Sequence, residues 1–142
     1  MGWASKMGKS RFDRDGFKQR TKQLALRIIR LTRSLPRSAE GEVIGRQLLR
    51  SGTSVGANYR AACRAKSPAD HINKLKIVEE EADETLYWLE LLVEAKIIPY
   101  SLLADLMKEA DEIVAIVVSS LKTQRSQLPQ PKGGSPAHSS NS

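Results

Sequence analysis

Apolar residues recur every three or four positions in four separate stretches of this chain. That spacing places them along one side of an α-helix, and no stretch shows the strict alternation typical of a strand. The four apolar stripes run over residues 17–35, 44–62, 75–92 and 103–121. The pattern therefore predicts four amphipathic helices and an all-α protein.

Short connections with capping and helix-ending residues separate the stripes. Candidate N-cap side chains precede three helices, and prolines end the first helix, open the third and precede the fourth. These residues are Asp13 or Asp15, Pro36, Ser38, Ser67, Pro68 and Pro99. Because short links return each helix beside the previous one, the chain is predicted to form an antiparallel up-down-up-down four-helix bundle. We expect a flexible basic arm over residues 1–14, the bundle over residues 15–124 and a disordered tail over residues 125–142.

The second predicted helix, residues 38–65, carries four arginines on one side. At 100° per residue, its apolar residues fall between about 140° and 220° when Arg46 is set to 0°. The arginines fall between about 320° and 40°, so they are expected to point away from the core. These arginines are Arg46, Arg50, Arg60 and Arg64.

A strip of small residues lies beside the apolar side of the same helix. Gly45, Gly52 and Gly56 would each weaken an isolated helix by about 1 kcal/mol relative to alanine, so they indicate close packing of a neighbouring backbone. The spacing leaves two alternatives open, a contact inside one subunit and a contact between subunits. Asn58 falls at the edge of the apolar side. Its amide is expected to form a structural hydrogen bond, with Glu80 or Glu84 as candidate partners, rather than to bind a ligand.

The charge of the chain changes sign between its two halves. Residues 1–67 hold 16 Lys/Arg and 4 Asp/Glu, a formal charge of +12, whereas residues 68–142 hold 7 and 12, a formal charge of −5. This asymmetry is typical of a protein that binds nucleic acid through its basic half, or of one that pairs basic and acidic surfaces within one chain or between copies.

The sequence offers little chemistry for catalysis or for metal binding. Its two histidines, His71 and His138, form no recognisable catalytic arrangement, and its single cysteine, Cys63, has no partner for a disulfide or a metal site. We therefore expect no enzymatic activity, no metal and no cofactor. No stretch is long and apolar enough for a membrane span or a signal peptide, so a cytoplasmic protein without membrane contact is expected.

Two motifs carry a family resemblance: RSGTSVGANYRAACRAKSPADHINKL, followed by EEEADETLYWLELL. They resemble the bacterial four-helix bundle protein family that includes the 23S ribosomal RNA intervening-sequence proteins, over about residues 24–121. The resemblance implies a cytoplasmic, homo-oligomeric ring, with a homopentamer as the expected form. The related accessory variability proteins of diversity-generating retroelements are similar in fold and bind nucleic acid, which makes a reverse transcriptase a candidate protein partner.

Two functional hypotheses follow from these observations. In the first, basic surfaces bind RNA or DNA without strong sequence specificity, because phosphate contacts require charge alone. The predicted contact residues are Arg27, Arg30, Arg46, Arg50, Arg60 and Arg64. In the alternative, the protein is a homo-oligomeric scaffold or protein-interaction module whose arginines meet the acidic third helix of the next subunit.

Overall fold

The computed structural model describes residues 13–129, and these residues form four α-helices joined by short turns. The helices are α2 (Arg14–Arg33), α3 (Ala39–Cys63), α4 (Pro68–Glu94) and α5 (Tyr100–Ser126). No strand occurs within residues 13–129, so the predicted all-α four-helix bundle is confirmed. The predicted arm and tail lie largely outside the described residues.

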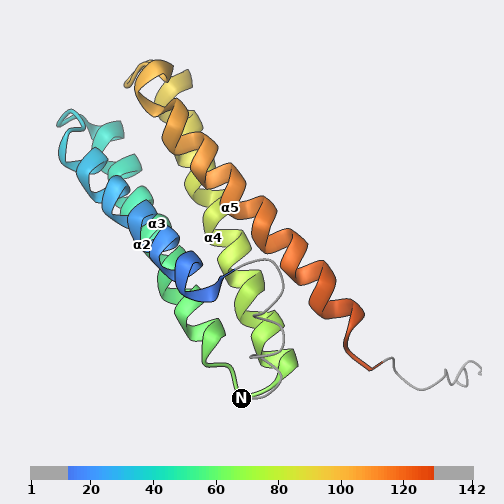
Figure 1. Cartoon of the computed structure of the whole chain (residues 1–142). Coiled ribbons are helices and arrows are strands. Elements are labelled where there is room, and N and C mark those ends of the chain that lie inside the picture. The colour runs from blue at the N-terminus through green and yellow to red at the C-terminus, as the bar shows by residue number, and fades with distance from the viewer. Residues whose placement is uncertain (1–12, 130–142) are drawn as a thin grey trace, which may run out of the picture.

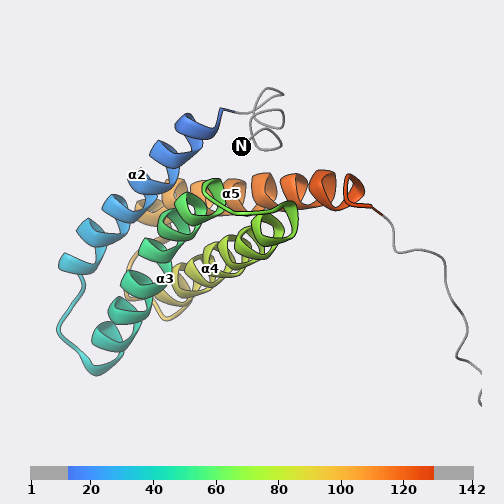
Figure 2. The ribbon, with the colours of Figure 1, turned by 90° about the horizontal axis from the view of Figure 1, so that it is seen from below.

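Successive helices run in opposite directions and form two hairpins, α2 with α3 and α4 with α5 (Figures 1 and 2). The helix α3 packs along both α2 and α4, and α5 packs mainly on α4. Of the four pairs of adjacent helices, α2 and α5 contact each other least. The α2–α3 hairpin therefore presents an outer surface that belongs to the basic half of the chain.

Three helices begin where a side chain accepts hydrogen bonds from free backbone N–H groups of the first turn. Asp13 accepts from the N–H groups of Asp15 and Gly16, at 3.2 and 3.1 Å. Ser38 and Ser67 cap α3 and α4 in the same way, each at 3.1 Å from a backbone nitrogen three residues later. The predicted caps at Ser38 and Ser67 are confirmed. Of the two candidate caps for the first helix, Asp13 or Asp15, the structure has Asp13 as the N-cap.

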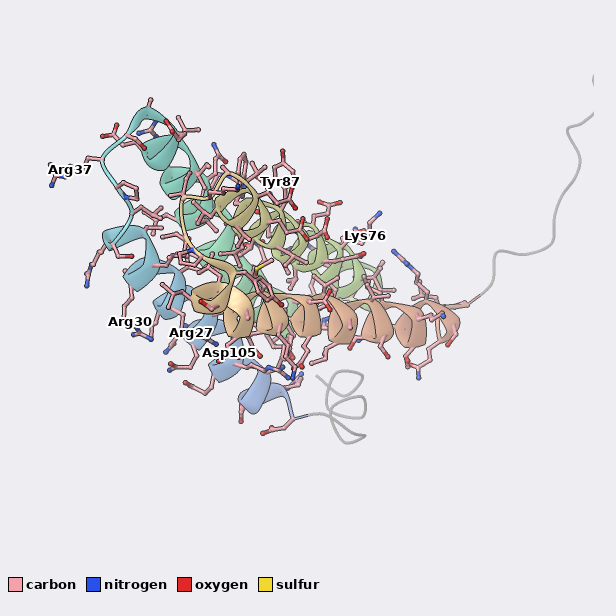
Figure 3. The ribbon with its side chains drawn as sticks, turned by 90° about the horizontal axis from the view of Figure 1, so that it is seen from above. Arg27, Arg30, Arg37, Lys76, Tyr87 and Asp105 are labelled. Atoms are coloured by element: carbon pink, nitrogen blue, oxygen red, sulfur yellow. The ribbon has the colours of Figure 1, made fainter. Side chains whose placement is uncertain are left out.

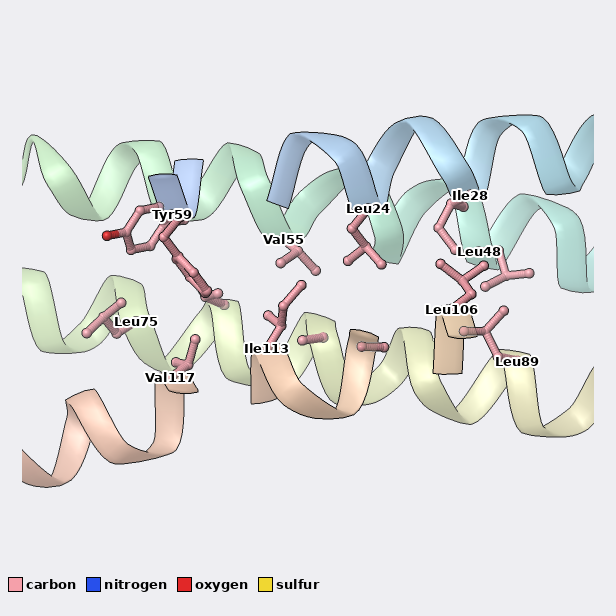
Figure 4. Packing of buried hydrophobic residues seen from close by; sticks show 14 of the residues in the cluster. Leu24, Ile28, Leu48, Val55, Tyr59, Leu75, Leu89, Leu106, Ile113 and Val117 are labelled. Carbon is pink, nitrogen blue, oxygen red and sulfur yellow. The ribbon is translucent and has the colours of Figure 1, made fainter. Parts of the chain in front are cut away.

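The four apolar stripes meet in one core that runs the length of the bundle (Figure 4). Leu24 and Ile28 of α2 and Leu48 of α3 are fully buried there, together with Leu89 of α4 and Ile113 of α5. Each such side chain contributes about 1.5–3 kcal/mol when it leaves water. Packing of these stripes therefore holds the helices in place.

One buried polar contact crosses from α3 to α4. The Ser51 and Thr85 hydroxyl oxygens lie 2.9 Å apart, and Thr85 Oγ1 also donates to the Glu81 carbonyl oxygen at 2.8 Å. Both side chains are fully buried, so the pair satisfies groups that would otherwise lose their hydrogen bonds to water. The amide of Asn58 does not reach α4; it donates to the Ser54 carbonyl oxygen of its own helix at 2.9 Å. The predicted partners Glu80 and Glu84 were therefore wrong.

The glycine strip of α3 faces α2 within the same chain. A Cβ atom at Gly52 would lie 2.9 Å from Ile28 Cγ1, and one at Gly56 would lie 3.1 Å from Thr21 Oγ1. At Gly45 the nearest neighbour would be the Leu35 side chain, at 3.4 Å. Of the two alternatives left open by the sequence, the contact inside one subunit is the one that these distances support.

Candidate functional site

The bodies of α2 and α3 contain no acidic residue. Residues 16–39 and 43–69 hold no Asp or Glu, and the four acids of the first half of the chain lie before α2 or in the first turns of the two helices. Carboxylates at a helix N-terminus interact favourably with the helix dipole and with unpaired N–H groups. The positions of these four acids are thus explained by the N-termini of α2 and α3. The rest of the α2–α3 hairpin surface carries positive charge.

Two arginines of the hairpin pair with acids of the other hairpin. Arg20 of α2 contacts Glu109 at 2.6 and 2.9 Å and Glu112 at 2.7 Å, both on α5. These bidentate contacts are partly shielded from solvent. Part of the charge asymmetry of the chain is therefore neutralised within one molecule, as one of the sequence interpretations allowed.

Arg50 makes the equivalent link from α3 to α4. Its guanidinium donates to Glu81 at 3.0 Å and also to Glu84, and its hydrogen bond to Glu84 holds the pKa of that carboxyl below its usual range. The Arg50 side chain is 45% exposed, so the pairs contribute no more than about 1 kcal/mol each. Arg50 was predicted to point away from the bundle, but its long side chain bends to α4.

Three further arginines form one exposed row, which we call the α3 arginine row: Arg46 and Arg60 of α3 and Arg64, the C-cap residue of that helix. Arg46 and Arg64 are 18 residues apart, so helix geometry places their backbone positions on the same side of the helix about 27 Å from each other. None of the three forms an ion pair with another residue of the described range 13–129. The row is therefore an exposed set of positive charges without an ion-pair partner among residues 13–129.

Arg27 and Arg30 do not join this row. Arg27 follows Arg20 by two helical turns and so lies on the side of α2 that turns toward α5, and Arg30 lies one turn further along. Figure 3 shows both side chains projecting outward from α2. The structure therefore divides the six predicted contact residues among the α3 arginine row, the edge at Arg27 and Arg30, and the internally paired Arg50.

Two basic residues of α2 that were outside the predicted set lie near the outer side of the hairpin. Lys22 follows Thr21, which packs against Gly56, and Arg33 is close to the end of the same helix. Both side chains are exposed and have no ion pair within residues 13–129.

A small polar cluster lies inside the end of the bundle where α3 leads into α4. His71 of α4 is buried, and its Nδ1 lies 2.7 Å from the Ala62 carbonyl oxygen, so Nδ1 carries the donated proton. Burial lowers the pKa of His71 and raises the pKa of the buried Tyr59 phenol. Both groups are thus held in their neutral forms by the core. Cys63 is half-buried and packs against that core.

Acidification from pH 7.5 to 5.5 is expected to destabilise the fold through His71. Burial lowers the pKa of His71 in the folded state. The imidazole therefore binds a proton at higher pH in the unfolded chain than in the folded chain. The stability contributed by the neutral ring is complete above the unfolded pKa of about 6.5 and falls as the pH drops below it. Urea unfolding at both pH values should show a larger loss for the wild type than for His71→Gln.

Equal losses in the two proteins would contradict this assignment. The lowered pKa values of Asp70 and Glu84 do not affect this comparison between pH 7.5 and 5.5. In the folded protein those carboxyls take up protons only below the ordinary carboxyl pKa of about 4.

The described residues supply no further site chemistry. Residues 13–129 contain no group of three or more His, Cys, Asp or Glu side chains placed to hold a metal ion. Within the same range, no helix is long and apolar enough to cross a membrane. The α3 arginine row and its neighbours are therefore the candidate binding surface among the described residues.

Comparisons with known proteins match most of the bundle. The family model described as 23S rRNA-intervening sequence protein matches residues 16–119. A crystal structure of a protein of unknown function from the S23 ribosomal protein family of Bacteroides thetaiotaomicron is similar, with a TM-score of 0.71 and 39% sequence identity. That match covers 77% of this chain and 97% of the other. No curated protein matches the chain.

Proposed function

Because this chain belongs to the 23S rRNA-intervening sequence protein family, we propose that it is a non-enzymatic four-helix bundle that binds nucleic acid through the outer surface of α2 and α3. The observation that carries the proposal is the α3 arginine row, three exposed cations without an ion pair in residues 13–129, in the acid-free segment 43–69. Lys22 and Arg33 extend this surface, and Arg27 and Arg30 provide a second basic edge.

The chemistry of this surface suits the phosphate backbone rather than the bases. Arginine side chains bind phosphate by charge and by paired N–H donors, and such contacts are the same for every sequence. Between the arginines lie Thr53 and Ala57, and the Thr53 hydroxyl already donates to the Leu49 carbonyl oxygen at 2.5 Å. Binding is therefore expected to depend strongly on salt and weakly on sequence.

Fluorescence anisotropy with mixed RNA and DNA fragments tests the proposal. Each phosphate that a cation neutralises releases counterions and adds about 0.9 to the slope of log affinity against log salt for a duplex. With about four contacts, affinity should fall roughly 10²-fold between 50 and 200 mM salt. The absence of detectable binding at 50 mM salt would overturn the proposed function.

A homo-oligomeric ring, with a homopentamer as the expected form, is the second part of the proposal. The observation that favours it is a set of exposed acids on α4 and α5 that form no ion pair within residues 13–129, and that are complementary in charge to basic residues outside the α3 arginine row on another copy. These acids are Glu80, Asp83, Glu90, Glu94, Asp105 and Asp111. Light scattering should report a mass of several subunits, and a monomer at micromolar concentration would contradict this part.

A further inference from the structure

We infer that the nucleic acid recognised by the α2–α3 surface is a double helix rather than a single strand. This inference rests on the proposed function, and it concerns the form of the ligand that the same surface would take.

The first reason is the position of the aromatic side chains. The aromatic residues of α2 and α3 are Phe17 and Tyr59, which are 5% and 3% exposed. Their rings pack edge to face with centroids 4.7 Å apart, inside the core. Single-strand binding draws about 1–3 kcal/mol per base from stacking on exposed aromatic side chains. The α2–α3 hairpin offers no such platform beside its arginines.

The other hairpin has two exposed tyrosines, Tyr87 and Tyr100 at the start of α5, and Tyr87 lies among acids. Tyr87 of α4 is 50% exposed and packs against Trp88, whose Nε1 donates to Glu84. Asp83 and Glu90 are exposed in the neighbouring turns. A strand that stacked on Tyr87 would bring its phosphates close to these carboxylates, so this surface is unsuited to a polyanion.

The second reason is the rigidity and charge density of the two partners. The α3 arginine row projects from a helix of 25 residues and from its C-cap residue, and the helix packs against two neighbours, so the backbone positions of the row keep a constant spacing. A duplex also holds its phosphates at fixed positions and carries one charge per about 1.7 Å of axis. A single strand has to be ordered on binding, and it releases fewer counterions per contact, about 0.7 against 0.9.

Matched probes test the inference with the full-length protein. The probes are a 24-base-pair RNA duplex, a DNA duplex of the same sequence, and single strands of that sequence without self-complementarity. At about 100 mM salt, we expect one or both duplexes to bind at least roughly tenfold more tightly than their single strands. The two duplex arms distinguish RNA from DNA. Tyr87→Ala should change no affinity by more than about twofold, since stacking contributes nothing.

Single strands that bind as tightly as duplexes, or more tightly, would overturn the inference while leaving the proposed function intact. A loss of single-strand binding in Tyr87→Ala would overturn it in the same way. Absence of binding to every probe would overturn both the proposed function and the inference.

Discussion

Gly52→Ala is expected to lower the free energy of unfolding by up to about 2 kcal/mol, although alanine normally stabilises a helix by about 1 kcal/mol relative to glycine. The added Cβ would lie 2.9 Å from Ile28 Cγ1 and 3.2 Å from Ile28 Cβ, and Ile28 is fully buried. Ile28 has no room to retreat in a close-packed core, so α2 has to shift, and such overpacking costs about 1–3 kcal/mol. Urea unfolding followed by circular dichroism, at one fixed protein concentration, measures the change.

Gly45→Ala is the matched control, because it makes the same substitution on the same side of α3. Its Cβ would meet only Leu35 Cδ1, at 3.4 Å, which is the flexible end of a half-buried side chain. Helix propensity should then dominate, and stability should rise by about 0.5–1 kcal/mol. If Gly52→Ala stabilised the protein as much as Gly45→Ala, the close approach of α2 to Gly52 would be refuted.

Removing the α3 arginine row is expected to weaken nucleic-acid binding on the order of 10–100-fold at about 100 mM salt. The variant carries Arg46→Gln, Arg60→Gln and Arg64→Gln together. Glutamine has a helix propensity close to that of arginine, and these side chains are exposed without ion pairs in residues 13–129, so the fold should persist. Anisotropy titrations of wild type and variant with the same duplex provide the measurement.

The control for this variant removes the same net charge from the other hairpin. Lys76→Gln, Lys108→Gln and Lys122→Gln change three exposed lysines of α4 and α5, and Figure 3 shows Lys76 projecting outward from α4. Long-range attraction falls equally in both variants, whereas phosphate contacts are lost only in the first. We expect less than about a threefold loss for the lysine variant. Equal losses would mean that binding follows net charge rather than the row.

Local patterns were sufficient to predict the helices and most of their starts. A stripe with 3.6-residue periodicity reports which side of a helix is buried, and the Ser38 and Ser67 caps depend only on the three residues that follow each serine. Contacts between helices depend on register, which a single helix does not encode. The glycine strip therefore indicated a close neighbour without identifying α2 as that neighbour.

The structure changed two interpretations drawn from the sequence. Both concern whether a side chain of α3 reaches across to α4. Arg50 points outward by periodicity, but its side chain is long enough to bend to Glu81 and Glu84. Asn58 is short, and it bonds within its own helix to Ser54. Angular position placed Arg50 away from the core and Asn58 at the edge of the apolar side. Side-chain length and the register of α3 on α4 decide which of the two residues crosses to α4.

The salt dependence of binding, compared between wild type and the arginine-row variant, tests the central claim most directly, because the slope of log affinity against log salt counts neutralised phosphates. If the three arginines contact phosphate, the variant's slope should be smaller in magnitude by about 2–3, roughly one for each lost contact. A variant that binds the same duplex with the wild-type slope would contradict the claim that this row is the nucleic-acid surface.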